Sequence, residues 1–295
     1  MKSNIDIIRA EHMGFCFGVK KAVDEVNAVH AQAKIGNSPK QIYVLGMLVH
    51  NEFVIEKLLS KGVIFLSEED VLSDNTSLRP GDTVIIRAHG TTKAVQEKLK
   101  EKDIKLIDMA CVYVKSAREQ VLLWEKKGYR SIFIGDKDHP EVKGITSYSK
   151  KPLIFGNLDE LKNSDTDREF QWVFLFQTTY NRYVFEEIDK YITENFKNSK
   201  VIKTICGATH ERQAAVENLA KTVDAVFIIG SHQSSNTKKL YQIAKKLNDK
   251  SYLIKDEKDI NKEMLKGVKK AGITAGASTP EELIEIIEEK IKELV

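Results

Sequence analysis

One pattern recurs three times along the 295-residue chain and restricts how the chain can fold. Each copy has a short run rich in Ile or Val, then a cysteine, then a stretch with the apolar spacing of an amphipathic helix. The cysteines are Cys16, Cys111 and Cys206, and both intervals between them are 95 residues. Such runs are typical of strands, and apolar residues three or four positions apart are typical of helices. The pattern predicts three similar repeats, each with one thiol.

Each repeat continues with two more predicted strands. The first of these closes on glycine, in the runs Tyr43–Gly46, Ile132–Gly135 and Val226–Gly230. The second begins at Val84, Val173 and Gly272. Strands that alternate with helices favour parallel β-α-β units with right-handed crossovers. We therefore expect an α/β protein whose three small repeats carry parallel sheets around a pseudo-threefold axis.

The predicted boundaries follow the cysteines. Residues 14–110 form the first repeat, 111–205 the second and 206–295 the third, with a strand in residues 1–13 expected to join the third. Three stretches lack apolar periodicity and carry turn residues, so they are predicted as surface loops. They are Ala33–Gln41, Ser67–Asp82 and Asn157–Arg168.

The composition excludes several classes of protein. Lys and Arg number 46 against 43 Asp and Glu, and no dense basic block or aromatic-basic interleaving indicates nucleic-acid binding. No run approaches the roughly 18 to 20 apolar residues that cross a bilayer, so no membrane span is expected. Residues 1–10 lack the apolar core of a secretory signal. A sparse, odd cysteine count then fits a reducing cytosol, and we expect a cytoplasmic protein.

Polar residues follow the predicted strands of all three repeats. In open parallel sheets, ligands bind outside the carboxyl ends of the strands. At those ends lie His50 and His89 in the first repeat, His139, Glu141 and Thr178 in the second, and Ser234, Ser235, Asn236 and Ser278 in the third. We therefore expect one central cavity, lined by these residues and by the three thiols.

The polar residues permit more than one interpretation. A group of imidazoles suits a phosphate-bearing anion, and hydroxyl and amide donors just before a helix suit a phosphate group. A lone histidine at a strand end is nevertheless often structural, and Ser and Asn routinely cap helices. The residues alone leave both interpretations open.

The cysteines also permit several interpretations. Free cysteines are among the most buried residue types, so three unrelated buried thiols are one possibility. Structural zinc sites mostly use closely spaced cysteine pairs, which this sequence does not contain. An iron–sulfur cluster accepts distant ligands when the fold gathers them, and three cysteines would leave one iron without a cysteine ligand. Such an iron can act as a Lewis acid towards a substrate oxygen, and the repeat favours this interpretation.

Seven short motifs carry a resemblance to a known family. They are Gly14-Phe15-Cys16-Phe17-Gly18-Val19, Ala88-His89-Gly90, His139-Pro140-Glu141-Val142-x-Gly144, Gln177-Thr178-Thr179, Cys206-x-Ala208-Thr209-x-x-Arg212-Gln213, Ser234-Ser235-Asn236 and Thr274-Ala275-Gly276-Ala277-Ser278. They extend over most of the chain in the order that the family has. The sequence therefore resembles the 4-hydroxy-3-methylbut-2-enyl diphosphate reductase family. It departs from the family pattern at Ala110 and Val112, which flank Cys111, and at Gln233.

The resemblance implies a trefoil α/β fold, a 4Fe–4S cluster and reduction of an allylic diphosphate to isopentenyl and dimethylallyl diphosphates. It implies that Cys16, Cys111 and Cys206 hold the cluster. Glu141 would deliver the proton, and Thr178 would lie beside the substrate hydroxyl. The diphosphate would be held by His50, His89, His139, Ser234, Ser235, Asn236 and Ser278. A ferredoxin or flavodoxin would donate electrons, and no appended RNA-binding domain is expected after the helix that begins at Glu281.

Two alternatives from other classes remain open. A three-cysteine cluster with an open iron is also compatible with a hydro-lyase, which eliminates water without net redox change from an anionic or phosphorylated substrate. A non-enzymatic phosphate-binding protein with structural or zinc-bound cysteines is the other. Iron content and dependence on a reductant distinguish the reductase, the hydro-lyase and the phosphate-binding protein.

Overall fold

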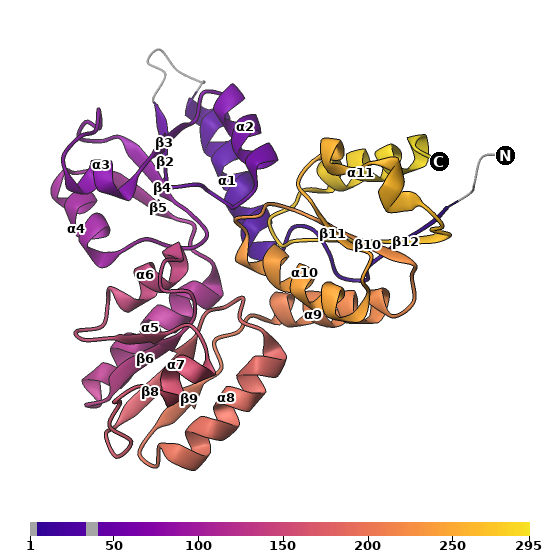
Figure 1. Cartoon of the computed structure of the whole chain (residues 1–295). Helices are drawn as coiled ribbons and strands as arrows, with labels where there is room; N and C mark the ends of the chain where they lie inside the picture. Colours follow the sequence, from indigo (N-terminus) through magenta and orange to yellow (C-terminus); the bar gives the residue numbers. More distant parts are fainter. Residues whose placement is uncertain (1–4, 34–40) are drawn as a thin grey trace. The chain divides into compact units, whose positions relative to one another are not determined.

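The computed structural model describes residues 5–33 and 41–295, and its framework is three four-stranded sheets (Figure 1). Every strand pairing in the described residues is parallel. The central strands are short, almost continuous apolar runs, as expected for strands that are covered on both faces. The predicted α/β class with parallel sheets is confirmed.

The first sheet has the strand order β3-β2-β4-β5. Its strands are β2 (Ile42–Leu45), β3 (Ile64–Leu66), β4 (Thr83–Ile86) and β5 (Lys105–Asp108). The helices between Cys16 and β5 in the sequence are α1 (Phe17–Ala33), α2 (Glu52–Ser60), α3 (Glu68–Leu72) and α4 (Lys93–Glu101). Val71 of α3 and Leu99 of α4 pack on Leu45 and Val84, so these helices cover one face of the sheet.

The second sheet repeats this order as β7-β6-β8-β9. Its strands are β6 (Arg130–Ile134), β7 (Leu153–Phe155), β8 (Trp172–Phe176) and β9 (Lys200–Ile202). Helices α5 (Val112–Lys126) and α6 (Pro140–Thr146) pack on one face, and α7 (Leu158–Lys162) and α8 (Arg182–Asn195) pack on the other. Aromatic side chains, among them Phe174 and Phe176, dominate the core beneath α7 and α8.

The third sheet is β1-β12-β10-β11, so the N-terminal strand pairs with the last one. Its strands are β1 (Asp6–Arg9), β10 (Ala225–Ile229), β11 (Ser251–Ile254) and β12 (Lys270–Ala275). Helices α9 (Gly207–Ala220) and α10 (Ser235–Leu247) cover one face, and α11 (Glu281–Glu293) covers the other. Two 3₁₀ turns, Glu257–Asp259 and Lys262–Leu265, lie between β11 and β12.

The three sheets place the cysteines in the same way. In each sheet one edge strand (β1, β5 or β9) is the strand that precedes a cysteine in the sequence. The first strand after each cysteine and its helix is β2, β6 or β10. Each of these strands lies second from the opposite edge of its own sheet. The repeat read from the sequence is therefore a repeat of strand order.

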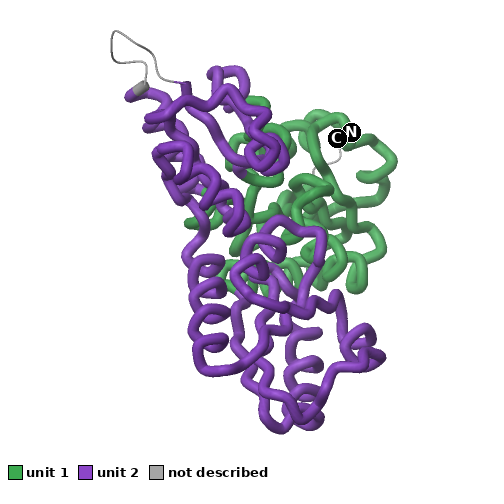
Figure 2. The backbone as a smooth tube through the Cα atoms, turned by 90° about the vertical axis from the view of Figure 1, so that its left-hand side faces the viewer, with its two compact units in different colours: residues 1–19, 49–57, 206–295 green, residues 20–48, 58–205 purple. Residues whose placement is uncertain are grey.

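The chain divides into two compact units, which are coloured separately in Figure 2. Unit 1 comprises residues 1–19, 49–57 and 206–295 and holds the third sheet. Unit 2 comprises residues 20–48 and 58–205 and holds the first two sheets. The division into three domains at residues 14–110, 111–205 and 206–295, and the predicted central cavity, stay predictions.

Two of the predicted loops contain single helical turns. Helix α3 begins after Ser67, whose hydroxyl accepts a hydrogen bond from the Asp70 amide at 2.9 Å. Helix α7 begins after Asn157, whose side-chain oxygen accepts from the Glu160 amide at 2.9 Å. Both are ordinary helix N-caps, which make a five-residue helix possible without a long apolar stripe. The remaining predicted loop is Ala33–Gln41. Most of it, residues 34–40, lies outside the described residues.

None of the helices in the described chain combines the length and the apolar character that a bilayer span requires.

Candidate active site

Each cysteine directly precedes a helix. Cys16 precedes α1, while Cys111 and Cys206 are the N-cap residues of α5 and α9. The Cys206 sulfur accepts a hydrogen bond from the Thr209 amide at 3.2 Å and lies 2.8 Å from the Thr209 hydroxyl. All three cysteines belong to the described residues, and none is in a disulfide. Helix N-termini present unpaired N–H groups, and the Thr209 amide is one that donates to a cysteine sulfur.

Glu141 is a buried carboxyl group in the first turn of α6. Its side chain is 1% exposed, and Pro140 before it is suited to the first helical position because proline has no N–H. Thr178, just after β8, donates to the Glu141 carboxylate twice, from its amide at 2.7 Å and from its hydroxyl at 2.8 Å. Burial raises the pKa of Glu141 to about 7, although the two bonds from Thr178 act in the opposite direction.

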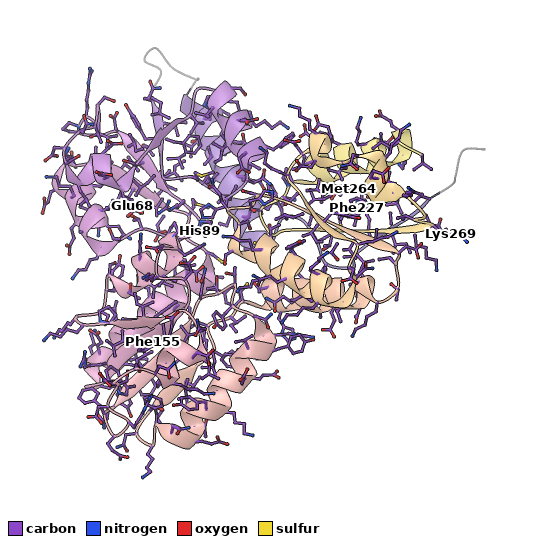
Figure 3. The ribbon with its side chains drawn as sticks, in the orientation of Figure 1. Glu68, His89, Phe155, Phe227, Met264 and Lys269 are labelled. Carbon is purple, nitrogen blue, oxygen red and sulfur yellow. The ribbon has the colours of Figure 1, made fainter. Side chains whose placement is uncertain are left out.

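His139 and His89 lie in the same unit as Glu141. His139 is the buried N-cap of α6, and its Nδ1 accepts the Glu141 amide at 3.2 Å. Because Nδ1 is an acceptor, the neutral ring carries its proton on Nε2. The His89 ring meets the His139 ring edge to face, with the centroids 5.3 Å apart. His89, labelled in Figure 3, follows β4 in a turn that closes at Gly90.

A buried arginine supports the turn that carries His89. Arg87 donates from Nε to the Gly90 carbonyl at 3.2 Å and from Nη2 to Glu68 at 2.6 Å. Gly46 lies against this guanidinium, and a Cβ at Gly46 would come within 2.0 Å of Arg87 Nη1. The sequence did not indicate Arg87 or Glu68, because nothing in a sequence distinguishes a buried arginine from an exposed one.

The hydroxyl and amide residues of unit 1 lie around the start of α10. Ser234 is the N-cap of this helix, and its hydroxyl accepts from the Thr237 amide at 3.3 Å. Ser235 is half-buried in the first turn, whereas Asn236 is 4% exposed. Among the described residues, neither the amide nitrogen nor the carbonyl oxygen of the Asn236 side chain has a hydrogen-bond partner. Buried amides are normally paired, so Asn236 is suited to a polar ligand.

Ser278 and His50 are in direct contact in unit 1. The Ser278 hydroxyl donates to the His50 carbonyl at 3.0 Å, and Ser278 is itself buried while His50 is half-buried. The structure thus brings together His50 with Ser278, and His89, His139, Glu141 and Thr178 with one another. The roles of these residues and of the three cysteines stay predictions.

A second buried arginine, Arg212, was also missed as a candidate, although it appears in one of the motifs. It lies in α9, is 6% exposed and bonds to the carbonyls of Gly14 and Ala208. Two signals were available: its place in the Cys206 motif, and its spacing from Cys206, since six positions along a helix place two residues less than two turns apart.

Comparisons with known proteins give a consistent result. The family model described as "LytB protein" matches residues 7–292. A Fusobacterium nucleatum protein named 4-hydroxy-3-methylbut-2-enyl diphosphate reductase is 46% identical over 288 residues, which is 98% of this chain and 34% of that protein. An Aquifex aeolicus protein of the same name is 38% identical over 98% of this chain and 97% of its own length. The chain therefore spans about a third of the first relative and nearly all of the second.

Two solved structures resemble the fold. The E-1-hydroxy-2-methyl-but-2-enyl-4-diphosphate reductase from Plasmodium falciparum matches with a TM-score of 0.87 and 29% identity, over 97% of this chain and 87% of that one. A structure titled (E)-4-hydroxy-3-methyl-but-2-enyl diphosphate reductase, the terminal enzyme of the non-mevalonate pathway, matches with a TM-score of 0.68 and 38% identity, over 98% and 99% of the two chains. The resemblance seen in the motifs is confirmed, and this chain belongs to the LytB protein family.

Proposed function

We propose that this chain reduces 4-hydroxy-3-methylbut-2-enyl diphosphate to isopentenyl and dimethylallyl diphosphates, the last step of the non-mevalonate isoprenoid pathway. The reaction consumes two electrons and two protons, breaks the allylic C–O bond and releases water. Membership of the LytB family and the names of its relatives support this assignment. The observation that carries it is the buried Glu141 carboxyl group, bonded to Thr178, with a pKa raised to about 7.

The cofactor is an iron–sulfur cluster, as is general for the family. We assign Cys16, Cys111 and Cys206 as its ligands, in a 4Fe–4S cluster with one iron that lacks a cysteine ligand. Three thiols without disulfides, each at the start of a helix, form a donor set that suits such a cluster. The Thr209 amide bond to the Cys206 sulfur is the kind of outer-shell contact that orients a ligand. When bound, the cluster supplies single electrons and a Lewis-acidic iron.

Glu141 delivers the proton that the leaving hydroxyl needs. Hydroxide leaves poorly, so protonation by a positioned carboxylic acid lowers the barrier. Burial keeps a proton on Glu141 near neutral pH. After the proton has gone, the amide and hydroxyl of Thr178 stabilise the carboxylate through the two bonds seen in the structure. The site thus stabilises Glu141 in both protonation states.

The diphosphate is bound by imidazole, hydroxyl and amide groups. In unit 2, His139 offers its Nε2 proton and His89 lies beside it. In unit 1, the positive end of the α10 dipole and the buried side chain of Asn236 suit a phosphate oxygen. The complete set is His50, His89, His139, Ser234, Ser235, Asn236 and Ser278.

The electrons come from a small redox protein of the ferredoxin or flavodoxin type. We place the reaction in the cytoplasm, where thiols remain reduced and available to iron. No nucleic acid takes part.

The test is product analysis under strictly anaerobic conditions, with the allylic diphosphate as substrate and with or without dithionite. We expect both C5 diphosphate products only when the reductant is present. Turnover without reductant would identify the hydro-lyase, whereas binding of the diphosphate without turnover would identify a phosphate-binding protein.

A further inference from the structure

We infer that Arg212 is a positioning residue for the cluster: one guanidinium fixes both cysteine-bearing segments of unit 1 and places a positive charge beside them. The inference rests on the proposed cluster, but it assigns a role to a residue that binds neither iron nor substrate. The segments are residues 14–16, which end at Cys16, and the first turn of α9, which follows Cys206.

The contacts of Arg212 connect these two segments. Its Nε and Nη2 atoms both donate to the Gly14 carbonyl, at 3.2 and 2.8 Å. Its Nη1 atom donates to the Ala208 carbonyl at 2.9 Å. Gly14 lies two residues before Cys16, and Ala208 lies two residues after Cys206. A planar guanidinium that makes bonds in two directions fixes orientation as well as distance.

The opposite side of the Cys16 segment is held by two backbone hydrogen bonds. The Gly14 amide donates to the Ala275 carbonyl at 3.2 Å, and the Cys16 amide donates to the Ala277 carbonyl at 3.1 Å. Gly14 adopts φ +68°, and a Cβ there would approach Ile284 to 3.2 Å. The segment therefore lies between the end of β12 and Arg212. Without the guanidinium it would lose the two bonds to the Gly14 carbonyl and keep the two backbone bonds on the β12 side.

Among the described residues, no carboxylate is in contact with the Arg212 guanidinium. Within residues 5–33 and 41–295, its hydrogen bonds go to carbonyl groups, and it is 6% exposed. A buried cation is costly unless opposite charge lies near it. Burial lowers the pKa of Arg212, and the nearby Cys16, Cys206 and Glu211 oppose that shift. Two of these three groups are the proposed cluster ligands, so the positive charge of Arg212 lies near both of them.

Two measurable consequences follow. A fixed positive charge near the ligands stabilises the more negative, reduced state of a cluster and so raises its reduction potential. The bonds to Gly14 also limit the motion of the Cys16 segment, with or without iron. Replacement of Arg212 by Gln removes the charge and the paired bonds, whereas Lys keeps the charge and cannot reproduce the two-directional contact.

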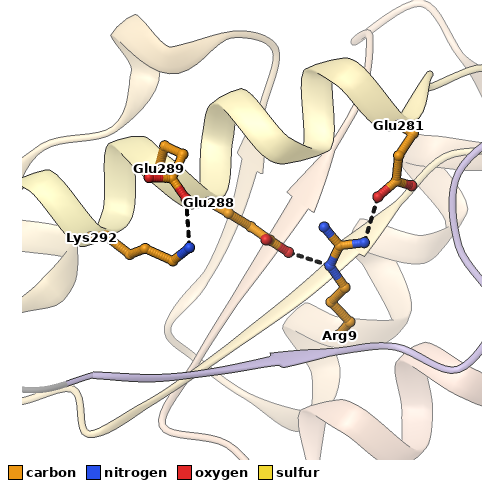
Figure 4. Close-up of polar contacts among 5 residues, drawn as sticks. All are labelled: Arg9, Glu281, Glu288, Glu289 and Lys292. Atoms are coloured by element: carbon orange, nitrogen blue, oxygen red, sulfur yellow. Dashed lines mark hydrogen bonds and ion pairs between the residues drawn. The ribbon is translucent and has the colours of Figure 1, made fainter.

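The experiment compares the wild type with Arg212→Gln, Arg212→Lys and a matched control, Arg9→Gln. Arg9 lies in the same unit but is exposed, and it pairs with Glu281 and Glu288 (Figure 4). Hydrogen exchange of the Gly14 and Cys16 amides is measured on the metal-free chains. The reduction potential and the iron retained per chain are measured after anaerobic reconstitution.

For Arg212→Gln we expect at least tenfold faster exchange at Cys16. We also expect at least a tenfold shift towards the oxidised cluster at a given potential, which is about 59 mV for a one-electron couple. Arg212→Lys should show the faster exchange and lower iron retention with a potential close to wild type. Arg9→Gln should match the wild type in all three.

Wild-type exchange at Cys16 in Arg212→Lys would overturn the positioning role, and this variant decides the matter if the Gln variant does not fold. A wild-type potential in a folded Arg212→Gln variant would overturn the electrostatic role. If the wild type itself takes up no iron, the proposed cluster fails, while the exchange measurement still decides whether Arg212 holds the segment.

Discussion

The carboxylate of Glu141 accepts two hydrogen bonds from Thr178, one from the amide at 2.7 Å and one from the hydroxyl at 2.8 Å. These two residues come from different strand ends, with Thr178 just after β8 and Glu141 in the helix that follows β6. Because β6 and β8 are parallel neighbours, their carboxyl ends lie together. The sheet therefore builds the buried acid from two distant parts of the sequence.

Glu141→Gln should lose turnover and keep the cluster and the substrate affinity. The amide has nearly the same shape and can still accept from the Thr178 N–H, but it has no acidic proton. General acids contribute roughly 10²- to 10⁴-fold to rate, so we expect kcat to fall at least about 100-fold. The assay is anaerobic turnover, with Glu187→Gln on the exposed side of α8 as the control. A Glu141→Gln variant with near-normal kcat would remove Glu141 from the mechanism.

The same substitution should change how stability depends on pH. The folded pKa of Glu141 is raised from an ordinary 4.5 to about 7, so the folded chain binds this proton more tightly than the unfolded chain. The free energy of unfolding therefore falls as pH rises from 4.5 to 7, by up to about 3 kcal/mol. Glu141→Gln lacks this contribution.

Urea unfolding of the two metal-free proteins at pH 5 and pH 8 measures the effect. The stability of the variant relative to the wild type should rise by about 2 to 3 kcal/mol between those pH values. A constant difference in stability between the two proteins would show that Glu141 is already ionised in the folded chain at pH 5. Its pKa would then not be raised.

Gly46→Ala should destabilise the turn that carries His89. Gly46 has φ +67°, and the new Cβ would come within 2.0 Å of Arg87 Nη1 and 2.7 Å of its Cζ. We expect a loss of about 3 kcal/mol, from backbone strain of about 1 kcal/mol plus displacement of the buried Arg87–Glu68 pair.

Gly62→Ala is the matched control, because Gly62 has φ +88° and nothing lies within 4 Å of the position that a Cβ would take there. Only the strain of about 1 kcal/mol applies at this site. Thermal unfolding measures both variants. Equal losses at the two sites would show that the contact with Arg87 contributes nothing.

Asn236→Ala should weaken substrate binding without weakening the fold. Among the described residues its side-chain amide has no partner, so its removal breaks no bond of the protein. We expect KM for the allylic diphosphate to rise about tenfold, the loss of roughly one hydrogen bond to a charged group. Thermal stability should stay unchanged or increase.

Asn181→Ala provides the contrast to Asn236→Ala. Asn181 caps α8, and its side-chain oxygen accepts from the amides of Tyr183 and Val184. Its loss should cost about 1 kcal/mol of stability and leave KM unchanged. If Asn236→Ala behaves in the same way, Asn236 is a structural residue.

The sequence was sufficient for the central strands and for the long helices that follow the three cysteines. Strands such as β8 and β10 are unbroken apolar runs that end in polar residues, because both of their faces are covered. The edge strands β3, β7 and β11 were not predicted. They are runs of only three or four residues (IFL, LIF and SYLI), too short to distinguish a strand from an apolar turn or helix end by pattern alone. Their position depends on pairing with a neighbour that is distant in sequence.

The candidate site was predictable only in part. Glu141 and Thr178 follow strands, and the rule that ligands bind at strand carboxyl ends selects such positions. Arg87 and Arg212 could not be selected in that way, because their partners include the carbonyls of Gly90 and Gly14. A backbone carbonyl has no signature in a sequence, so a side chain that binds one is visible only after folding.

The central claim is that the three cysteines, one from each repeat, together hold one iron–sulfur cluster. The direct measurement is iron and acid-labile sulfide in the anaerobically isolated chain and in the single variants Cys16→Ala, Cys111→Ala and Cys206→Ala. We predict about four irons per wild-type chain and a loss of most of that iron in each variant. A zinc-loaded wild type, or any one variant that keeps its full iron content, would contradict the account.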